Sequence, residues 1–175
     1  MPLVLNPVDS RYPACLGKRL GTHALPQLSS LGNLDLLALP KTALFCSTCC
    51  PGRAILAAYD QAACWRDAGR CIVSGFHSPV EKECLRILLR GSQPIIICPA
   101  RSLEKMRLAV DWQKSLTAGR LLILSCVTGR NCRITTSLAT RRNEFVAALA
   151  DEVWFAHIAP GGETQRLSER IATRD

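Results

Sequence analysis

The chain has 175 residues, and its 48% hydrophobic content is enough for the core of one domain but marginal for two. Its 22 lysines and arginines outnumber its 14 acidic residues, so the net charge of +8 favours a polyanionic partner, nucleic acid or a nucleotide, over a cationic ligand. The apolar runs are far shorter than the ~20 residues that cross a bilayer, and no signal-peptide pattern begins the chain. We therefore expect a soluble, cytoplasmic protein with no membrane partner.

The expected strands and helices begin after residue 40. The first 40 residues are rich in Pro, Gly and Leu without regular periodicity, and they predict an irregular lead-in (1–40) packed on one domain (41–175). From Thr42 onward, short apolar runs alternate with stretches of helical periodicity. The apolar runs predict strands at 42–46, 71–74, 94–98, 121–126 and 153–157. The helical stretches predict helices starting at Pro51 and Pro79, one or two short helices within 101–118, and a helix over about 134–150.

The predicted strands are apolar almost throughout, as expected for strands that are buried on both faces of a sheet. Strands that alternate with helices in this way indicate an α/β protein, a three-layer Rossmann-like fold whose mostly parallel sheet carries helices on both faces. Right-handed crossovers then bring all the loops from strand to helix to one edge of the sheet, where ligands of such folds bind.

Three of those loops are suited to phosphate. They are Cys46-Ser47-Thr48, Ser74-Gly75-Phe76-His77-Ser78 and Pro160-Gly161-Gly162-Glu163-Thr164. Glycine lets backbone amides approach an anion, Ser and Thr add hydroxyl donors, and a helix N-terminus adds free N–H groups. Any single loop is equally well explained as an ordinary tight turn, but three at one edge favour a phosphate-lined site.

A basic stretch points to the same edge. No acidic residue lies between Asp111 and Glu144, whereas Arg130 and Arg133 follow the fourth predicted strand, and Arg141 and Arg142 lie in the next helix. Guanidinium groups match the oxygens of phosphate, although such a run is often only a solvated helix face. Aromatic residues make up only 5% of the chain, which limits base stacking to a few candidates such as Phe76.

Other chemistry finds little support in the sequence. Ten cysteines in a chain without an export signal are best explained as reduced thiols. Cys46, Cys49 and Cys50 with His77 lack the second ligand pair of a structural zinc site. Glu81 completes a capping box with Ser78, which explains it better than acid–base catalysis with His77. No Ser-His-Asp, H-E-x-x-H or Walker A pattern occurs, so we expect no catalytic residue, metal or cofactor.

Several of these segments carry a resemblance to a known family. They are Tyr12-Pro13-Ala14-Cys15-Leu16, Gly32-Asn33-Leu34-Asp35-Leu36-Leu37, Cys46-Ser47-Thr48, Val73-Ser74-Gly75-Phe76-His77-Ser78-Pro79-Val80-Glu81, Arg142-Asn143 and Ala150-Asp151-Glu152-Val153. The fourth looks like an S-G-[FML]-A-x-G-x-[DE] loop, and Arg142-Asn143 matches an R-N pair. From Tyr12 to Thr164, the chain therefore resembles the DNA-processing protein A (DprA/Smf) family, reduced to its Rossmann-like domain.

The resemblance implies that single-stranded DNA binds in a basic pocket, that a homodimer forms through the Rossmann domain, and that a RecA-type recombinase is loaded during transformation. It implies that Ser47, Gly75 and Arg142 line the pocket, that Asn143 holds its loops together, and that Gly161 with Gly162 cradles a phosphate. With the loops and the basic stretch, the candidate DNA- or phosphate-binding residues are Ser47, Thr48, Ser74, Gly75, Phe76, His77, Arg130, Arg133, Arg141, Arg142, Asn143, Gly161, Gly162 and Thr164.

One departure from the family pattern bears on function. The family's G-S-R reads Cys46-Ser47-Thr48 here, so an arginine that would contact phosphate is replaced by Thr48. Phosphoribohydrolases of the lysine-decarboxylase-like type carry P-G-G-x-G-T-x-x-E, and residues 160–164 begin similarly but do not continue in register. Three hypotheses follow: a non-enzymatic single-stranded DNA-binding protein of DNA uptake and recombination, a nucleotide-binding sensor, and a degenerate phosphoribohydrolase-like protein.

Overall fold

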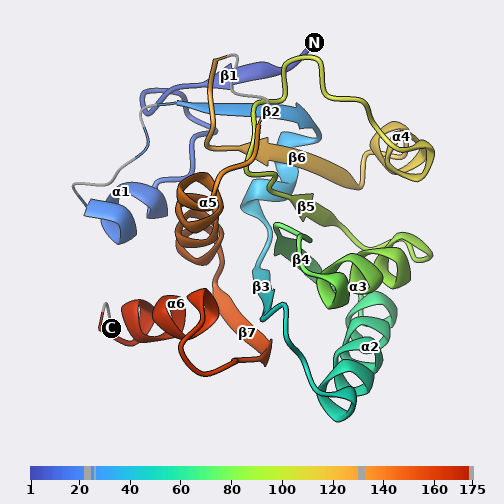
Figure 1. Cartoon of the computed structure of the whole chain (residues 1–175). Helices are drawn as coiled ribbons and strands as arrows, with labels where there is room; N and C mark the ends of the chain where they lie inside the picture. Colours follow the sequence, from blue (N-terminus) through green and yellow to red (C-terminus); the bar gives the residue numbers. More distant parts are fainter. Residues whose placement is uncertain (22–24, 26, 130–132, 174–175) are drawn as a thin grey trace.

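The computed structural model describes residues 1–21, 25, 27–129 and 133–173. Within them, seven strands form one sheet in the order β1-β2-β6-β5-β4-β3-β7 (Figure 1). The strands are β1 (Leu3–Leu5), β2 (Leu28–Gly32), β3 (Lys41–Cys46), β4 (Cys71–Ser74), β5 (Ile95–Ile97), β6 (Leu121–Ser125) and β7 (Glu152–His157). The helices are α1 (Cys15–Leu20), the 3-10 helix η2 (Leu34–Ala38), α2 (Gly52–Asp67), α3 (Pro79–Leu89), α4 (Val110–Thr117), α5 (Thr136–Leu149) and α6 (Glu163–Ala172).

The five strands β3 to β7 pair in parallel and confirm both the strands predicted from the apolar runs and the predicted fold class. β3 lies between β4 and β7, so the first parallel strand along the chain is the neighbour of the last. Every residue of β3, β4, β5 and β6 is buried, because helices cover both faces of the sheet.

The N-terminal segment contains regular structure in place of the irregular lead-in that composition suggested. β1 and β2 pair antiparallel, and β2 pairs antiparallel with β6, so the two strands extend the parallel sheet at one edge. In β2, Leu28 and Ser30 are buried while Ser29 and Leu31 are only partly so. A strand that buries a serine and ends in glycine lacks the apolar run by which the other strands were predicted.

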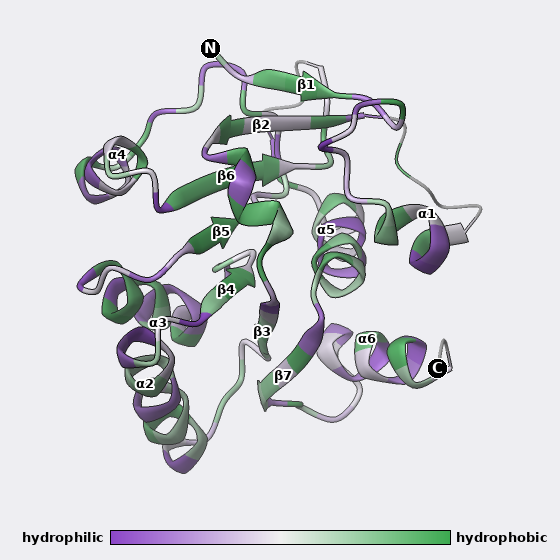
Figure 2. Ribbon diagram, turned by 180° about the vertical axis from the view of Figure 1, so that it is seen from behind, coloured by the Kyte–Doolittle hydropathy of each residue, from purple (hydrophilic) through white to green (hydrophobic). Residues whose placement is uncertain are grey.

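The helices divide between the two faces. Figure 1 shows α1, α5 and α6 on one side of the sheet and α2, α3 and α4 on the other. Each side buries its own cluster: Leu16, Phe145 and Leu167 belong to the first, and Ala62 and Leu88 to the second. The hydropathy colouring of Figure 2 follows this layering, with apolar strands inside and hydrophilic residues on the outer helix faces. No helix in the described residues is long and apolar enough to cross a membrane.

The helices at 51, 79 and 134–150 are confirmed as α2, α3 and α5, and segment 101–118 contains one helix, α4. The sequence did not predict α6. Its mean hydropathy is low, and Leu167 is the one fully buried residue among its ten positions. Its apolar residues nevertheless recur with helical periodicity, so this pattern could have predicted the helix.

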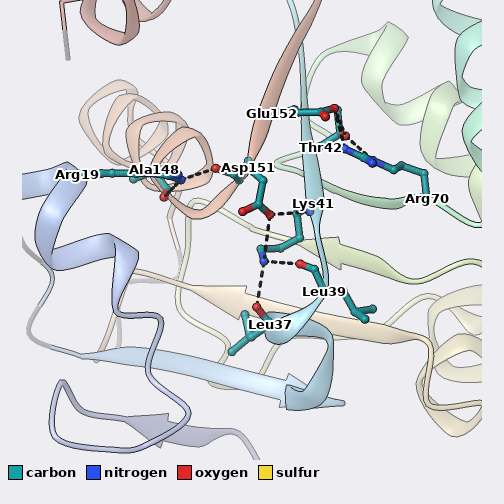
Figure 3. Close-up of polar contacts among 10 residues, drawn as sticks. Arg19, Leu37, Leu39, Lys41, Thr42, Arg70, Ala148, Asp151 and Glu152 are labelled. Carbon is teal, nitrogen blue, oxygen red and sulfur yellow. Dashed lines mark hydrogen bonds and ion pairs between the residues drawn. The ribbon is translucent and has the colours of Figure 1, made fainter. Parts of the chain in front are cut away.

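Polar contacts tie the N-terminal segment to the amino ends of β3 and β7, at the end of the sheet opposite the strand-to-helix loops (Figure 3). Lys41 is 5% exposed, and its Nζ donates to the carbonyls of Leu37 at 2.9 Å and Leu39 at 2.6 Å. Its charge lies 3.6 Å from the Asp151 carboxylate. Arg19 of α1 donates to the carbonyl of Ala148 near the end of α5. These bonds satisfy buried donors and carbonyls, which would otherwise destabilise the fold.

Candidate functional site

A cavity of about 680 Å³ opens beyond the carboxyl ends of β3 and β7. Its walls come from the loops after β3, β4 and β7, the first half of α5 and the first turn of α6. The three loops that the sequence predicted to meet at one edge therefore do meet, at the edge where α/β folds bind ligands.

Glu81, in the first turn of α3, connects the loops after β3 and β4 through hydrogen bonds of its side chain. Its Oε1 accepts a hydrogen bond from the Cys46 amide at 2.9 Å, and its Oε2 accepts from the amides of His77 at 2.8 Å and Ser78 at 3.2 Å. Ser78 and Glu81 form the predicted capping box. Burial raises the pKa of the Glu81 carboxyl, against the opposing effect of these amides and of the Arg142 charge. The carboxylate accepts these hydrogen bonds from backbone amides alone, so Glu81 supports the loops that form the cavity.

Ser47 joins the loops after β3 and β7. Its hydroxyl accepts a hydrogen bond from the Ala159 amide at 2.8 Å, and its own amide donates to the His157 carbonyl at 3.0 Å. The side chain is buried, whereas the neighbouring Thr48 is exposed and lies on the cavity wall. Ser47 therefore shapes the cavity, and Thr48 presents its side chain to a ligand.

Arg142 reaches from α5 under the loop that follows β4. The residue is only 4% exposed; its Nη1 donates to the Cys98 carbonyl at 3.1 Å and its Nε to Asn143 Oδ1 at 2.8 Å. The guanidinium also packs on the backbone of Gly75, where a Cβ atom would overlap it. Burial lowers the pKa of Arg142, and the nearby Glu81 carboxylate opposes that shift. Since arginine stays protonated in proteins, the cavity contains a fixed positive charge in its wall.

The structure brings most of the predicted site residues to this cavity. Those on its wall are Ser47, Thr48, His77, Arg142, Asn143, Gly161, Gly162 and Thr164. Arg133 and Arg141 are exposed and lie next to the wall residues Ile134 and Thr140 in the chain, but they are not part of the wall. Arg130 lies outside the described residues.

Three predicted residues lie beneath the wall. Ser74 is fully buried, and its hydroxyl accepts a hydrogen bond from the Phe76 amide at 3.1 Å. Phe76 is 5% exposed and packs in the core on the α2 and α3 side, so its ring is not available to stack on a base. The interpretation of Phe76 as a stacking platform was wrong, because an aromatic ring gains more from burial in this small core than on the surface. Gly75 acts through its contact with Arg142.

Two helix N-termini face the cavity. Thr135 caps α5, its hydroxyl accepting from the Leu138 amide at 3.2 Å, and Gly162 precedes α6 without a side-chain cap. Gly161 makes the turn into α6 with a φ of 72°, a conformation that favours glycine, and its amide donates to Gln165 Oε1 at 2.6 Å. Helix N-termini stabilise anions, so both helices favour negative charge at this place.

The sequence analysis missed the wall residues at the start of α5, namely Ile134, Thr135, Thr136, Ala139 and Thr140. The run Thr135-Thr136-Ser137, just before a helical pattern, is a capping signal. That signal, together with a preceding strand, could have placed the helix start at the same edge of the sheet.

The electrostatic character of the wall is mixed. Among the described residues that line it, Arg142 is the one Lys or Arg, and Glu81 and Glu163 bring two carboxyl groups. Glu163 accepts from the Thr140 hydroxyl at 3.1 Å and pairs with Arg166 at 2.5 Å, and these bonds lower its pKa. Most of the chain's positive charge therefore lies outside the cavity.

The thiols near the cavity are not grouped as metal ligands. Among the residues that the structure describes, no three His, Cys, Asp or Glu side chains lie close enough to share a metal ion. Cys46 is buried, and its Sγ donates to the Ser47 carbonyl at 3.4 Å.

No protein-family model and no curated protein sequence matches the chain. Solved structures do. DNA processing protein A from Streptococcus pneumoniae superposes with a TM-score of 0.81 over 99% of this chain, at 21% identity. This chain has the fold of DNA processing protein A. DNA processing protein A from Helicobacter pylori superposes with a TM-score of 0.73 over 98% of this chain, at 19% identity. That structure gave insight into the single-stranded DNA binding mode of the H. pylori protein.

The fold of DNA processing protein A thus extends over nearly the whole chain, including the N-terminal strands β1 and β2. The motif resemblance seen in the sequence is confirmed at the level of the fold. The chain spans 60% of the length of the S. pneumoniae protein and 78% of that of the H. pylori protein.

Proposed function

We propose that this protein binds single-stranded DNA at the cavity beyond β3 and β7 and catalyses no reaction there. The observation that carries the proposal is the convergence of Arg142 and the N-termini of α5 and α6 on one cavity of this fold. Each of these three elements stabilises a phosphate, by charge or by free backbone N–H groups. The structural relative from H. pylori, described with a single-stranded DNA binding mode, supports the same ligand.

The exposed arginines extend the proposal from one nucleotide to a strand. Arg133 and Arg141 lie next to wall residues in the chain and are exposed, so their side chains are free to contact phosphates that leave the cavity. The net charge of +8 strengthens the attraction of a polyanion over the whole surface. Because one phosphate in the cavity is followed by others along the strand, the exposed arginines become part of the binding surface.

The biological setting extends the proposal further. A single-stranded DNA-binding protein of this fold would act in the cytoplasm during DNA uptake, transformation and recombination, with a RecA-type recombinase as its partner and a homodimer as its working form. The fold shared with DNA processing protein A supports this setting.

A second candidate is a sensor that binds a mononucleotide without cleaving it. The mixed charge of the wall favours it, since Arg142 stands with Glu81 and Glu163, and a volume of about 680 Å³ suits a small ligand. A degenerate phosphoribohydrolase is less well supported. The two bonds of Glu163, to Thr140 and Arg166, occupy the carboxylate of its P-G-G-E-T segment.

A titration with three ligands separates the candidates. Fluorescently labelled oligothymidine, duplex DNA of equal length and a set of mononucleotides are titrated with the protein at two salt concentrations. DNA binding predicts that the single strand binds most tightly and that its affinity falls as salt rises, because phosphate contacts release counterions.

Binding of mononucleotides alone, detected as a rise in thermal stability, would favour the sensor. Release of free base from a nucleoside monophosphate would establish a hydrolase and contradict both. Affinity for oligothymidine that does not change with salt would contradict DNA binding through phosphate.

A further inference from the structure

The loop after β3 carries thiols that DNA binding does not use. Cys46, Cys49 and Cys50 lie within residues 46–50, and in the described part of the chain every cysteine is a free thiol. Cys46 and Cys49 belong to the cavity wall, and Cys50 packs against the hydrophobic cluster that buries Cys46. A change in the state of these thiols would therefore act on the binding site itself.

Two of the three thiols pack in the same hydrophobic cluster. Cys46 is a buried member of the hydrophobic cluster on the α2 and α3 side, and Cys50 packs against that cluster. Cys46 Sγ also lies 3.4 Å from the Ser47 carbonyl oxygen. Cys46 is 5% exposed, whereas Cys50 is half-buried. The pair thus combines a thiol that a small reagent can reach with a buried thiol four residues away in the same cluster, which suits an attacking and a resolving cysteine.

We propose that Cys46 and Cys50 form a disulfide when the protein meets a low-molecular-weight disulfide such as oxidised glutathione, and that this bond weakens ligand binding at the cavity. The weakening of ligand binding rests on the proposed function, whereas the formation of the disulfide does not.

The chemistry is an ordinary thiol–disulfide exchange in two steps. The Cys50 thiol loses its proton and its sulfur attacks the reagent's disulfide, which releases one reagent thiol and leaves a mixed disulfide on Cys50. The Cys46 thiol then loses its proton, its sulfur attacks the Cys50 sulfur, and the second reagent thiol leaves. The two protein thiols are oxidised by two electrons, and the reagent is reduced to two thiols.

The second step needs the Cys46 thiolate. Burial raises the pKa of the Cys46 thiol far above its ordinary range, and the groups that face it, Cys50 from the loop and Glu81 and Cys84 from α3, raise it further. Little Cys46 thiolate exists at neutral pH, so closure of the disulfide accelerates as pH rises.

The bond would fix the loop that shapes the cavity. It closes residues 46–50 into a ring that contains Ser47, whose hydroxyl holds the Ala159 amide, and Thr48 on the wall. The Cys46 amide is also bonded to Glu81, so a shift of Cys46 reaches the loop after β4. By reciprocity, a bound ligand slows oxidation by the same free energy with which the disulfide weakens the ligand.

Mass spectrometry tests the bond. Trypsin releases residues 42–53 as one peptide that contains all three thiols. After treatment with oxidised glutathione and alkylation, this peptide should carry one alkyl group and one internal disulfide, which dithiothreitol reverses. Cys49→Ser should retain the disulfide, Cys50→Ser should lose it, and Cys64→Ser, an exposed thiol on α2, should behave as wild type. A disulfide that survives in Cys50→Ser, or glutathione found on Cys49 alone, would overturn the proposal.

Binding measurements test the consequence. Oxidised wild type should bind oligothymidine about fivefold or more weakly than the reduced protein, while Cys50→Ser should bind equally well after either treatment. Unchanged affinity in protein whose disulfide is proven would overturn control of binding. If reduced protein does not bind oligothymidine at all, the proposed function fails, and the mass measurement still decides whether the thiol pair exists.

Discussion

Gly75 lies so close to the guanidinium of Arg142 that a Cβ atom at this glycine would overlap three atoms of that group. Gly75→Ala should therefore displace Arg142 from the Cys98 carbonyl and lower the free energy of unfolding by about 1–3 kcal/mol, as expected for overpacking. Urea denaturation measures the change. Gly52→Ala is the matched control, because no atom lies within 4 Å of the Cβ position at Gly52. Equal stability of the two variants would show that the contact between Gly75 and Arg142 carries no energetic weight.

Arg142 and Arg141 are adjacent in the chain, and substituting each of them should distinguish a structural role from a role in binding. Arg142→Met leaves the buried Cys98 carbonyl and Asn143 without their charged donor, so the free energy of unfolding should fall by about 2 kcal/mol or more. Arg141 is exposed, and Arg141→Met should leave stability nearly unchanged.

In binding, Arg141→Met should weaken the affinity for oligothymidine and make its salt dependence shallower by about 0.7, the share of one phosphate contact on a single strand. Melting curves and titrations of both variants provide the measurements. An Arg142→Met protein as stable as wild type would contradict the structural role assigned to this side chain.

Thr48 offers a gain of function. Thr48 is exposed on the cavity wall. It occupies the position where the G-S-R motif of the DNA-processing protein A family has arginine. Thr48→Arg should tighten binding of oligothymidine and steepen the salt dependence by about 0.7. Thr48→Gln, a long uncharged side chain, controls for added contact area. The same gain in both variants would indicate that charge at this position is irrelevant.

His77 reports on the cavity through its titration. Burial, with help from the charges of Arg142 and Lys82, lowers the pKa of His77 below its ordinary value of about 6.5. The unfolded chain then binds this proton more readily than the native state, so stability should fall as pH drops through and below about 6.5. Unfolding measured across this range should show a weaker decline in His77→Gln.

Ligand binding should reverse the shift in His77. A phosphate in the cavity would offset the repulsion from Arg142, so saturating oligothymidine should raise the pKa of His77 followed by NMR. A pKa that stays constant while the protein is saturated would mean that the strand binds elsewhere on the surface.

The sequence predicted the parallel core well, because its five strands are mostly apolar runs that need no tertiary information, and β3 to β6 are buried throughout. The sequence predicted less well the elements whose formation depends on tertiary contacts. β2 pairs with β6, and the edge strand β1 pairs with β2. β1 has only three residues and β2 contains two serines, so neither carries a strong strand signal. Their existence is determined by the sheet on which they pack.

The candidate site, too, was predicted only in part. Turn residues and hydroxyls at strand ends revealed its loops, since the carboxyl ends of parallel strands must share an edge. The sequence could not show that Arg142 is buried, because most arginines are exposed and only the carbonyl of Cys98, 44 positions away, accommodates this one. Phe76 was misinterpreted for the same reason, as its burial depends on helices α2 and α3.

The hydrogen bond between Ser47 and Ala159 joins residues 112 positions apart, and it bears on how the protein is made. A chain that grows from its N-terminus completes β3 before β7, and β3 gains β7 as its neighbour only when residues 152–157 have left the ribosome. Until then the cavity has one wall missing, and no ligand can bind it. Any protection that the ligand gives against proteolysis or aggregation therefore begins only after β7 has joined the sheet.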